Sequence, residues 1–320
     1  MTTESTPPPA AIRNPAPEDF ALLLLLALMW GSSFFFIKQA MDSGTLPPLS
    51  LAVGRITIGA AMLLTIAFAK GQAMPRSPGL WVRMVFLGIL GNSLPFFLIA
   101  WGEQFTPSNL AAILMATIPS FVVVLAHFFT RDEPLTLGKG LGCLLGFAGV
   151  LALIGVDALQ GLGSMVIGQT AILAGALSYS FYGIQARRLP RMGSEILVGT
   201  ILLAGLIPLI PVWLAVDQPW TLAPSGQAWL SIAWLGLLST GGGNLLFFLL
   251  LRRVGAGFGS FNNYLVPLMG LGWGYFLADE RPTWNALAAL VLILTGLACA
   301  RWLKPSLKPA ASPSTAAPQR

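Results

Sequence analysis

The sequence predicts an all-α polytopic membrane protein, with ten transmembrane helices in two inverted five-helix repeats and both termini in the cytoplasm. Three observations lead to this fold class: an apolar composition, ten apolar segments, and a one-sided distribution of Lys and Arg. Of the 320 residues, 55% are hydrophobic and 9% are charged, whereas soluble domains carry about 25% charged residues. The mean hydropathy of +0.76 agrees with a membrane protein.

The apolar segments are each close to the roughly 20 residues that a helix needs to cross a bilayer. They lie at residues 20–41, 47–69, 80–101, 107–130, 136–156, 165–187, 194–216, 227–250, 256–278 and 283–303. Because they are long and do not alternate apolar with polar residues, they predict helices rather than a barrel. The tails at 1–19 and 304–320, which are rich in proline, are predicted to be disordered.

The basic residues predict the orientation in a cell membrane (the inner or plasma membrane). With the N-terminus inside, fifteen of the 18 Lys and Arg residues fall on the cytoplasmic side, and Arg281 alone lies in an outer loop. Lys38 and Arg55 fall within segments. This bias follows the positive-inside rule, so the net charge of +6 does not indicate nucleic acid binding.

The two halves of the chain resemble each other. Matching positions recur about 148 residues later in the same order: Leu87-Gly88 as Leu235-Gly236, Ile118-Pro119 as Val266-Pro267, and Ala27 to Trp30 as Ala176 to Tyr179. Since five crossings is an odd number, the second repeat (165–303) enters the membrane upside down relative to the first (20–156). Inverted repeats are typical of transporters with a substrate site near the midplane. The alternative is chance similarity between apolar sequences.

Several short motifs of the sequence occur in the same order as in a known family. They are Trp30-Gly31-Ser32-Ser33, Arg55, Thr106 to Ala112, Pro119, Glu133 with Gly146 and Gly149, and then Pro267, Glu280 and Gly296. With them the chain resembles the drug/metabolite transporter superfamily, in its EamA-like ten-helix branch, over roughly residues 20–303. The resemblance implies export or uptake of amino acids, other metabolites or drugs. Four-helix multidrug members carry a glutamate deep in helix one, and Ala27 to Gly31 contains no acidic residue in its place.

Helix-breaking residues indicate where a substrate would bind. The third segment contains Gly91 to Pro95, and the eighth contains Thr240 to Asn244. Such residues free backbone groups that protein or water must satisfy. Asn92 and Asn244 are therefore predicted to line a central cavity, the alternative being close packing of helices through small residues.

Aromatic and amide residues add to the predicted substrate-binding set. Trp30 and Ser33 share one face of the first helix, and Tyr179 and Tyr182 share a face of the sixth. Their rings suit a small amphipathic ligand, or else contact lipid. Three further residues are predicted to contribute: Asn262 and Asn263, which point about 100° apart, and Met115, which supplies an adaptable contact or simply packs.

The embedded and terminal charged residues have separate interpretations. Arg55 needs a partner, either as a structural anchor or from a substrate carboxylate. Trp101 and Glu103 form a gate at the outer end of the third segment, or Glu103 is a solvated helix end. Glu133 and Glu280 are expected to cap the helices that follow them. His127 packs locally or relays protons.

The expected function is transport of small organic solutes by alternating access, as an exporter. A neutral cavity favours amino acids, including aromatic or amphipathic ones; the alternatives are a drug, nucleoside or sugar carrier, an intramembrane enzyme, or a channel. The motifs GxSxG and HExxH are missing and there is one histidine, so no catalytic residue, metal site or cofactor is predicted. The predicted partners are a small-molecule substrate and the lipid bilayer. Gly138, Gly142 and Gly146 predict a close helix contact, within a monomer or in a homodimer.

Overall fold

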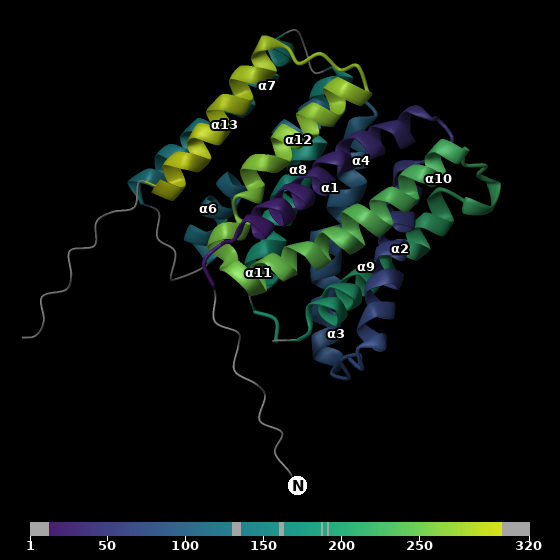
Figure 1. Ribbon diagram of the computed structural model, residues 1–320. Coiled ribbons are helices and arrows are strands. Elements are labelled where there is room, and N and C mark those ends of the chain that lie inside the picture. Colours follow the sequence, from purple (N-terminus) through teal and green to yellow (C-terminus); the bar gives the residue numbers. More distant parts are fainter. Residues whose placement is uncertain (1–12, 130–135, 160–162, 187, 191, 303–320) are drawn as a thin grey trace, which may run out of the picture.

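The computed structural model of the protein is a bundle of helices (Figure 1). It describes residues 13–129, 136–159, 163–186, 188–190 and 192–302, and within these ranges it contains no strand. The elements are α1 (Pro17–Asp42), α2 (Pro48–Ala69), α3 (Pro78–Gly88), η1 (Ile89–Ser93), α4 (Leu94–Glu103), α5 (Ser108–Met115), α6 (Ile118–Phe129), α7 (Leu137–Leu159), α8 (Ser164–Ala186), α9 (Ser194–Val216), η2 (Pro219–Thr221), α10 (Gly226–Ala233), η3 (Trp234–Gly242), α11 (Gly243–Gly259), α12 (Asn262–Leu277) and α13 (Trp284–Trp302).

The all-helical class predicted from the sequence is confirmed. Among the described residues, seven helical runs are long and apolar enough to cross a membrane, and two shorter apolar helices lie at Leu137–Leu153 and Trp284–Ala300. Ten crossings stay a prediction. The predicted disordered tail was too long, because α1 already begins at Pro17, with the Asp19 carboxylate accepting the Ala16 N–H at 2.9 Å.

Proline sets the start of several helices. Pro17, Pro48 and Pro78 each occupy the first helical position, where the missing N–H costs nothing and the fixed φ suits a helix. The three helices therefore begin within three residues of the predicted starts at 20, 47 and 80.

Helices α2 and α9 pack along each other and are bonded at both ends. Lys70, just after α2, donates to Glu195 at the start of α9 at 2.7 Å. At the other ends, Ser50 donates to Asp217 at 2.6 Å and accepts from Trp213 Nε1 at 2.8 Å. Because the end of α2 meets the start of α9, the two helices are antiparallel.

Helices α7 and α13 lie side by side along one edge of the bundle (Figure 1). Their contact depends on glycine: a Cβ at Gly142 would be 2.5 Å from the Gly296 carbonyl, and Gly149 faces Ile293. Gly146 instead faces Ser120 of α6. The close contacts of Gly142 and Gly146 therefore lie within the chain.

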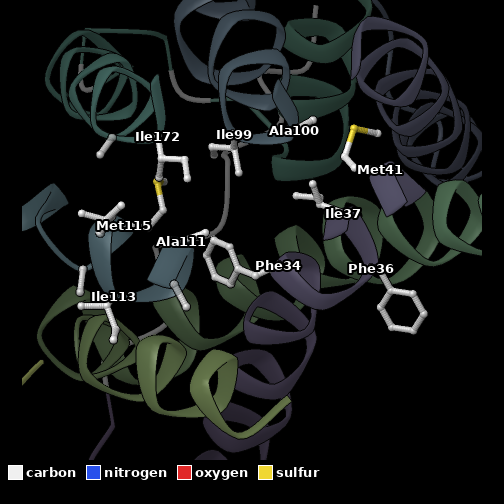
Figure 2. Close-up of a cluster of buried hydrophobic side chains, with 14 of the residues drawn as sticks. Phe34, Phe36, Ile37, Met41, Ile99, Ala100, Ala111, Ile113, Met115 and Ile172 are labelled. Carbon is white, nitrogen blue, oxygen red and sulfur yellow. The ribbon is translucent and has the colours of Figure 1, made fainter. Parts of the chain in front are cut away.

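The middle of the bundle is filled by a cluster of apolar side chains (Figure 2). Phe34 and Ile37 come from α1, Ile99 from α4, Ile113 from α5 and Ile172 from α8, and all are nearly or fully buried. Each helix contributes the side chains of one face, so the cluster fixes how α1, α4, α5 and α8 meet.

Two π-helical segments, η1 and η3, interrupt the regular α-helical hydrogen bonding of the third and eighth predicted segments. They contain or adjoin the stretches Gly91 to Pro95 and Thr240 to Asn244, where the sequence predicted helix breaks. The sequence therefore predicted the positions of the two irregular segments correctly, but both helices continue through them and do not break. π-Bulges occur often at functional sites, because the widened turn leaves backbone groups for other partners.

Candidate functional site

Side chains from α1 and α8 meet carbonyl groups of the two π-helical segments. The Trp30 indole N–H donates to the Ser239 carbonyl of η3 at 3.0 Å. The Ser178 hydroxyl donates to the Leu90 carbonyl of η1 at 2.8 Å. Each irregular segment is thus held by a different neighbouring helix.

Arg55 is a buried residue of α2 whose side chain contacts α4 and η3. Its residue is 8% exposed, its Nε donates to Thr240 Oγ1 at 2.8 Å, and its guanidinium carbon lies 3.8 Å from the centre of the Phe96 ring. Among the described residues, no carboxylate lies within 4 Å of it and its two terminal nitrogens have no acceptor. The ring contributes a cation–π contact, but a buried charge is normally paired with an opposite charge.

Aromatic and amide residues contact the two partners of this arginine, Phe96 and Thr240. The Phe96 and Tyr179 ring centres are 6.3 Å apart, and the Asn244 amide donates to the Thr240 carbonyl at 2.7 Å. We call Arg55, Phe96, Tyr179, Thr240 and Asn244 the central cluster. It joins α2, α4, α8, η3 and α11, which are far apart in the sequence.

Other predicted substrate-binding residues lie near the two π-helical segments. Trp30 packs on Phe247, with ring centres 5.4 Å apart, beside η3. The Tyr182 ring lies against Gly91 of η1, next to the half-buried Asn92. Ser33 is buried on α1.

The three remaining predicted residues, like the four just described, lie outside the central cluster. Met115 lies in the apolar core beside Ile172 (Figure 2), so its contacts are those of packing. At the start of α12, Asn262 is buried and Asn263 is exposed. The 100° between adjacent helical positions explains this difference.

The two gate candidates at the end of α4 differ in exposure. Trp101 is half-buried and packs on Phe105, with ring centres 5.2 Å apart. Glu103 is 0% exposed, so the interpretation of a solvated helix end was wrong. The physical reason is that Gly102 lets α4 approach α8 closely at Gly168, which covers this turn. His127, by contrast, is exposed near the end of α6.

Glu280 caps a different helix from the one expected. It was predicted to cap the helix that follows it, α13, but its carboxylate accepts the Ser108 N–H at 2.8 Å, the Ser108 hydroxyl at 2.9 Å and the Asn109 N–H at 2.8 Å. These donors belong to the first turn of α5. Glu280 thus satisfies the free amides of a helix in the other half. Glu133 lies outside the described residues.

A cavity of about 340 Å³ lies next to this capped helix end, away from the central cluster. It is bounded by the start of α5, the 280–283 segment and the start of α13. Its lining residues include Asn109, Leu110, Leu153, Met165, Glu280 and Asn285.

Sequence reasoning missed several residues that build the site. Phe96 follows the Pro95 helix breaker, yet one apolar ring among many carries no distinguishing signal. Ser178 and Ser239 are ordinary small residues whose role depends on the widened turns. Thr240 lies in a stretch predicted to break the helix, but only the structure shows that its hydroxyl accepts a hydrogen bond from Arg55.

Comparisons with known proteins agree with this architecture. The model of the EamA-like transporter family matches twice, at residues 20–155 and 166–302. The chain is 26% identical over 301 residues to an uncharacterized inner membrane transporter, YedA, of Escherichia coli (strain K12), covering 92% of this chain and 94% of that protein.

Two further comparisons concern an exporter with a named cargo and a solved structure. A probable terminal-alkyne amino-acid exporter of Streptantibioticus cattleyicolor is 27% identical over 277 residues, which cover 86% of this chain and 90% of the exporter. A solved crystal structure aligns with a TM-score of 0.65 at 22% identity, covering 91% of this chain and 99% of the other. The resemblance predicted from the sequence is confirmed: the chain belongs to the EamA-like transporter family and is a membrane transporter.

Proposed function

We propose that the protein exports small zwitterionic or uncharged amphipathic solutes, amino acids foremost, by alternating access between two inverted five-helix repeats. The observation that carries the choice of cargo is the unpaired guanidinium of Arg55 in the central cluster. The amino-acid exporter among the relatives is consistent with this choice.

Arg55 suits a substrate carboxylate for geometric and electrostatic reasons. A guanidinium presents a planar fork of N–H donors that matches the two oxygens of a carboxylate. Thr240 Oγ1 accepts the hydrogen bond of Arg55 Nε, and the Phe96 ring covers one face of the guanidinium. The two terminal nitrogens are therefore the donors available to a substrate. A bound carboxylate would therefore compensate a charge that is costly to bury alone.

The rest of the central cluster suits the other parts of an amino acid. The Phe96 and Tyr179 rings offer an apolar wall for a side chain. The Tyr179 hydroxyl and the Asn244 carboxamide can donate and accept hydrogen bonds. No second arginine or lysine belongs to the cluster, which favours a substrate without excess negative charge.

Alternating access is supported by the way the site is assembled. η1 and η3 lie in corresponding positions of the two family matches, and each is held by the helix that begins the opposite match. A site that draws on both halves and lies beside their interrupted helices is typical of carriers with inverted repeats. In this proposal, rocking of the halves exposes Arg55 to each side of the inner membrane in turn.

Counterflow in proteoliposomes tests the proposed function. Vesicles loaded with unlabelled L-phenylalanine or L-threonine should accumulate the labelled amino acid transiently, and the same assay with nucleosides and sugars should not. Arg55→Gln should weaken apparent affinity about tenfold or more, because a charged hydrogen bond contributes about 1.5–3 kcal/mol.

Matched variants separate binding from folding. Tyr179→Ala and Asn244→Ala should impair counterflow in protein that elutes as a folded species. The exposed Arg83→Gln and Tyr275→Ala should transport at the wild-type rate. Wild-type counterflow in Arg55→Gln and Tyr179→Ala would refute the assignment of the site, and counterflow of nucleosides alone would refute the cargo.

A further inference from the structure

Glu103 is an acidic side chain without a partner in the interior. It is 0% exposed, and neither carboxyl oxygen has a hydrogen-bond partner among the described residues. Two neighbouring turns hold further buried polar groups without a hydrogen-bond partner among the described residues. They are the Thr106 hydroxyl and both the oxygen and the nitrogen of the Gln169 amide. The close approach of Gly102 and Gly168 brings these turns of α4 and α8 together.

Among the described residues, no charged group on the elements packed around Glu103 forms an ion pair with it. On α1, Lys38 pairs with Asp42 at 2.7 Å. On α2, Arg55 donates to Thr240, and the Glu280 carboxylate caps α5. The helices α5 and α8 carry no Asp, Glu, Lys or Arg among their described residues, and α8 adds only the titratable hydroxyls of Tyr179 and Tyr182. None of these residues forms an ion pair with Glu103.

We propose that Glu103 carries a proton in this conformation, and that its release and uptake couple transport to the pH gradient across the membrane. A buried carboxylate that lacks a cation and hydrogen-bond donors is costly, whereas the neutral acid is much less so. The site is closed to an organic cation here because the carboxyl group is fully covered, so a proton is the occupant that the geometry allows.

The position of Glu103 connects this proton to the substrate site. Glu103 ends α4, the helix that carries Phe96 and follows η1 directly. Arg55 lies on α2, which packs against α4, and its guanidinium carbon is 3.8 Å from the centre of the Phe96 ring of α4. Movement of α4 that opens the turn at Gly102 would admit water to the carboxyl group and let the proton leave, and the same movement would shift Phe96 relative to Arg55.

Infrared spectroscopy tests the protonation without any substrate. Purified wild-type protein at pH 7 should show a carboxylic-acid C=O stretching band that is missing from Glu103→Gln and retained in the control Glu18→Gln, whose side chain is 64% exposed. Identical spectra for the wild type and Glu103→Gln would overturn the proposal.

Transport driven by a pH gradient tests the coupling, and this arm rests on the proposed function. Wild-type proteoliposomes should change their amino-acid accumulation several-fold when a pH gradient is imposed. Glu103→Gln, an isosteric neutral side chain, should keep counterflow without a gradient and lose the response to pH, whereas Glu103→Asp and Glu18→Gln should keep the response.

The outcomes distinguish the two proposals. Wild-type counterflow that ignores the pH gradient, or a full response in Glu103→Gln, would overturn the coupling role. A wild type without counterflow of any amino acid would overturn the proposed function instead, and the infrared band would still decide whether Glu103 holds a proton.

Discussion

At the scale of single residues, polar side chains join parts of the chain that are distant in sequence. Glu280 and Ser108 are 172 positions apart, and Arg55 and Thr240 are 185 apart. In both contacts a side chain bonds a group that would otherwise be buried without a partner. A buried group that loses its partner bears its full desolvation cost. Single substitutions at these contacts therefore have large and specific effects.

Glu280→Ala should destabilise the protein by about 1 kcal/mol or more, because helix caps contribute this much and a carboxylate also interacts with the helix dipole. Glu280→Gln should have a smaller effect, since it keeps an acceptor oxygen. Thermal unfolding in detergent measures the difference. The control is Glu18→Ala, whose carboxylate is 64% exposed in a surface ion pair of small energetic value. Equal melting temperatures for Glu280→Ala and Glu18→Ala would contradict the capping role.

At the scale of elements, glycine sets the distance between helices. A Cβ at Gly88 of α3 would lie 2.5–2.6 Å from backbone atoms of Gly205 on α9, closer than real Cβ contacts. Backbone atoms cannot rotate away as a flexible side chain can. Small residues of this kind allow membrane helices to pack closely.

Gly88→Ala should therefore separate α3 from α9 and reduce the yield of folded protein. Gly272→Ala on α12 is the matched control, because nothing lies within 4 Å of a Cβ built there. That substitution should be neutral or stabilise the helix by up to about 1 kcal/mol. Size-exclusion profiles of fluorescently tagged protein measure both yields. A monodisperse, wild-type yield of Gly88→Ala would show that the contact relaxes at no cost.

At the scale of the whole molecule, basic residues gather where α1 and α9 begin and α2 and α11 end. Lys70 and Arg252 lie 2.7 and 3.7 Å from the Glu195 carboxylate. Arg13 pairs with Asp19 at 2.9 Å, and the Arg13 N–H donates to the Arg253 carbonyl. All four cations were assigned to the cytoplasmic side from the sequence, and the structure places them in contacts between these helix ends.

Reporter fusions test the orientation that this arrangement favours. A green fluorescent protein fused to the C-terminus should fluoresce, and alkaline phosphatase fused there should be inactive, because both results require a cytoplasmic terminus. Alkaline phosphatase inserted in the 218–225 segment between α9 and α10 should be active. An active phosphatase at the C-terminus would reverse the orientation.

The sequence was most informative where one physical signal dominates. Apolar length located the helices, and the helix-breaking residues Gly91 to Pro95 and Thr240 to Asn244 located both irregular segments. The central cluster was only partly predictable: Arg55, Tyr179 and Asn244 stand out as polar groups in apolar segments, whereas Phe96 does not. Glu280 shows what the sequence could not predict. Its negative charge indicated a helix cap, but which helix it caps depends on how the two halves pack together.

The antiparallel pair α2 and α9 has a mechanical consequence. Bonds at both ends, from Lys70 to Glu195 and from Ser50 to Asp217, oppose both sliding and splaying of the two helices. Arg55 lies between these ends on α2. Because α2 belongs to the first family match and α9 to the second, the rocking proposed above would turn about this pair as a hinge, and a carboxylate bound to Arg55 would stay beside the hinge.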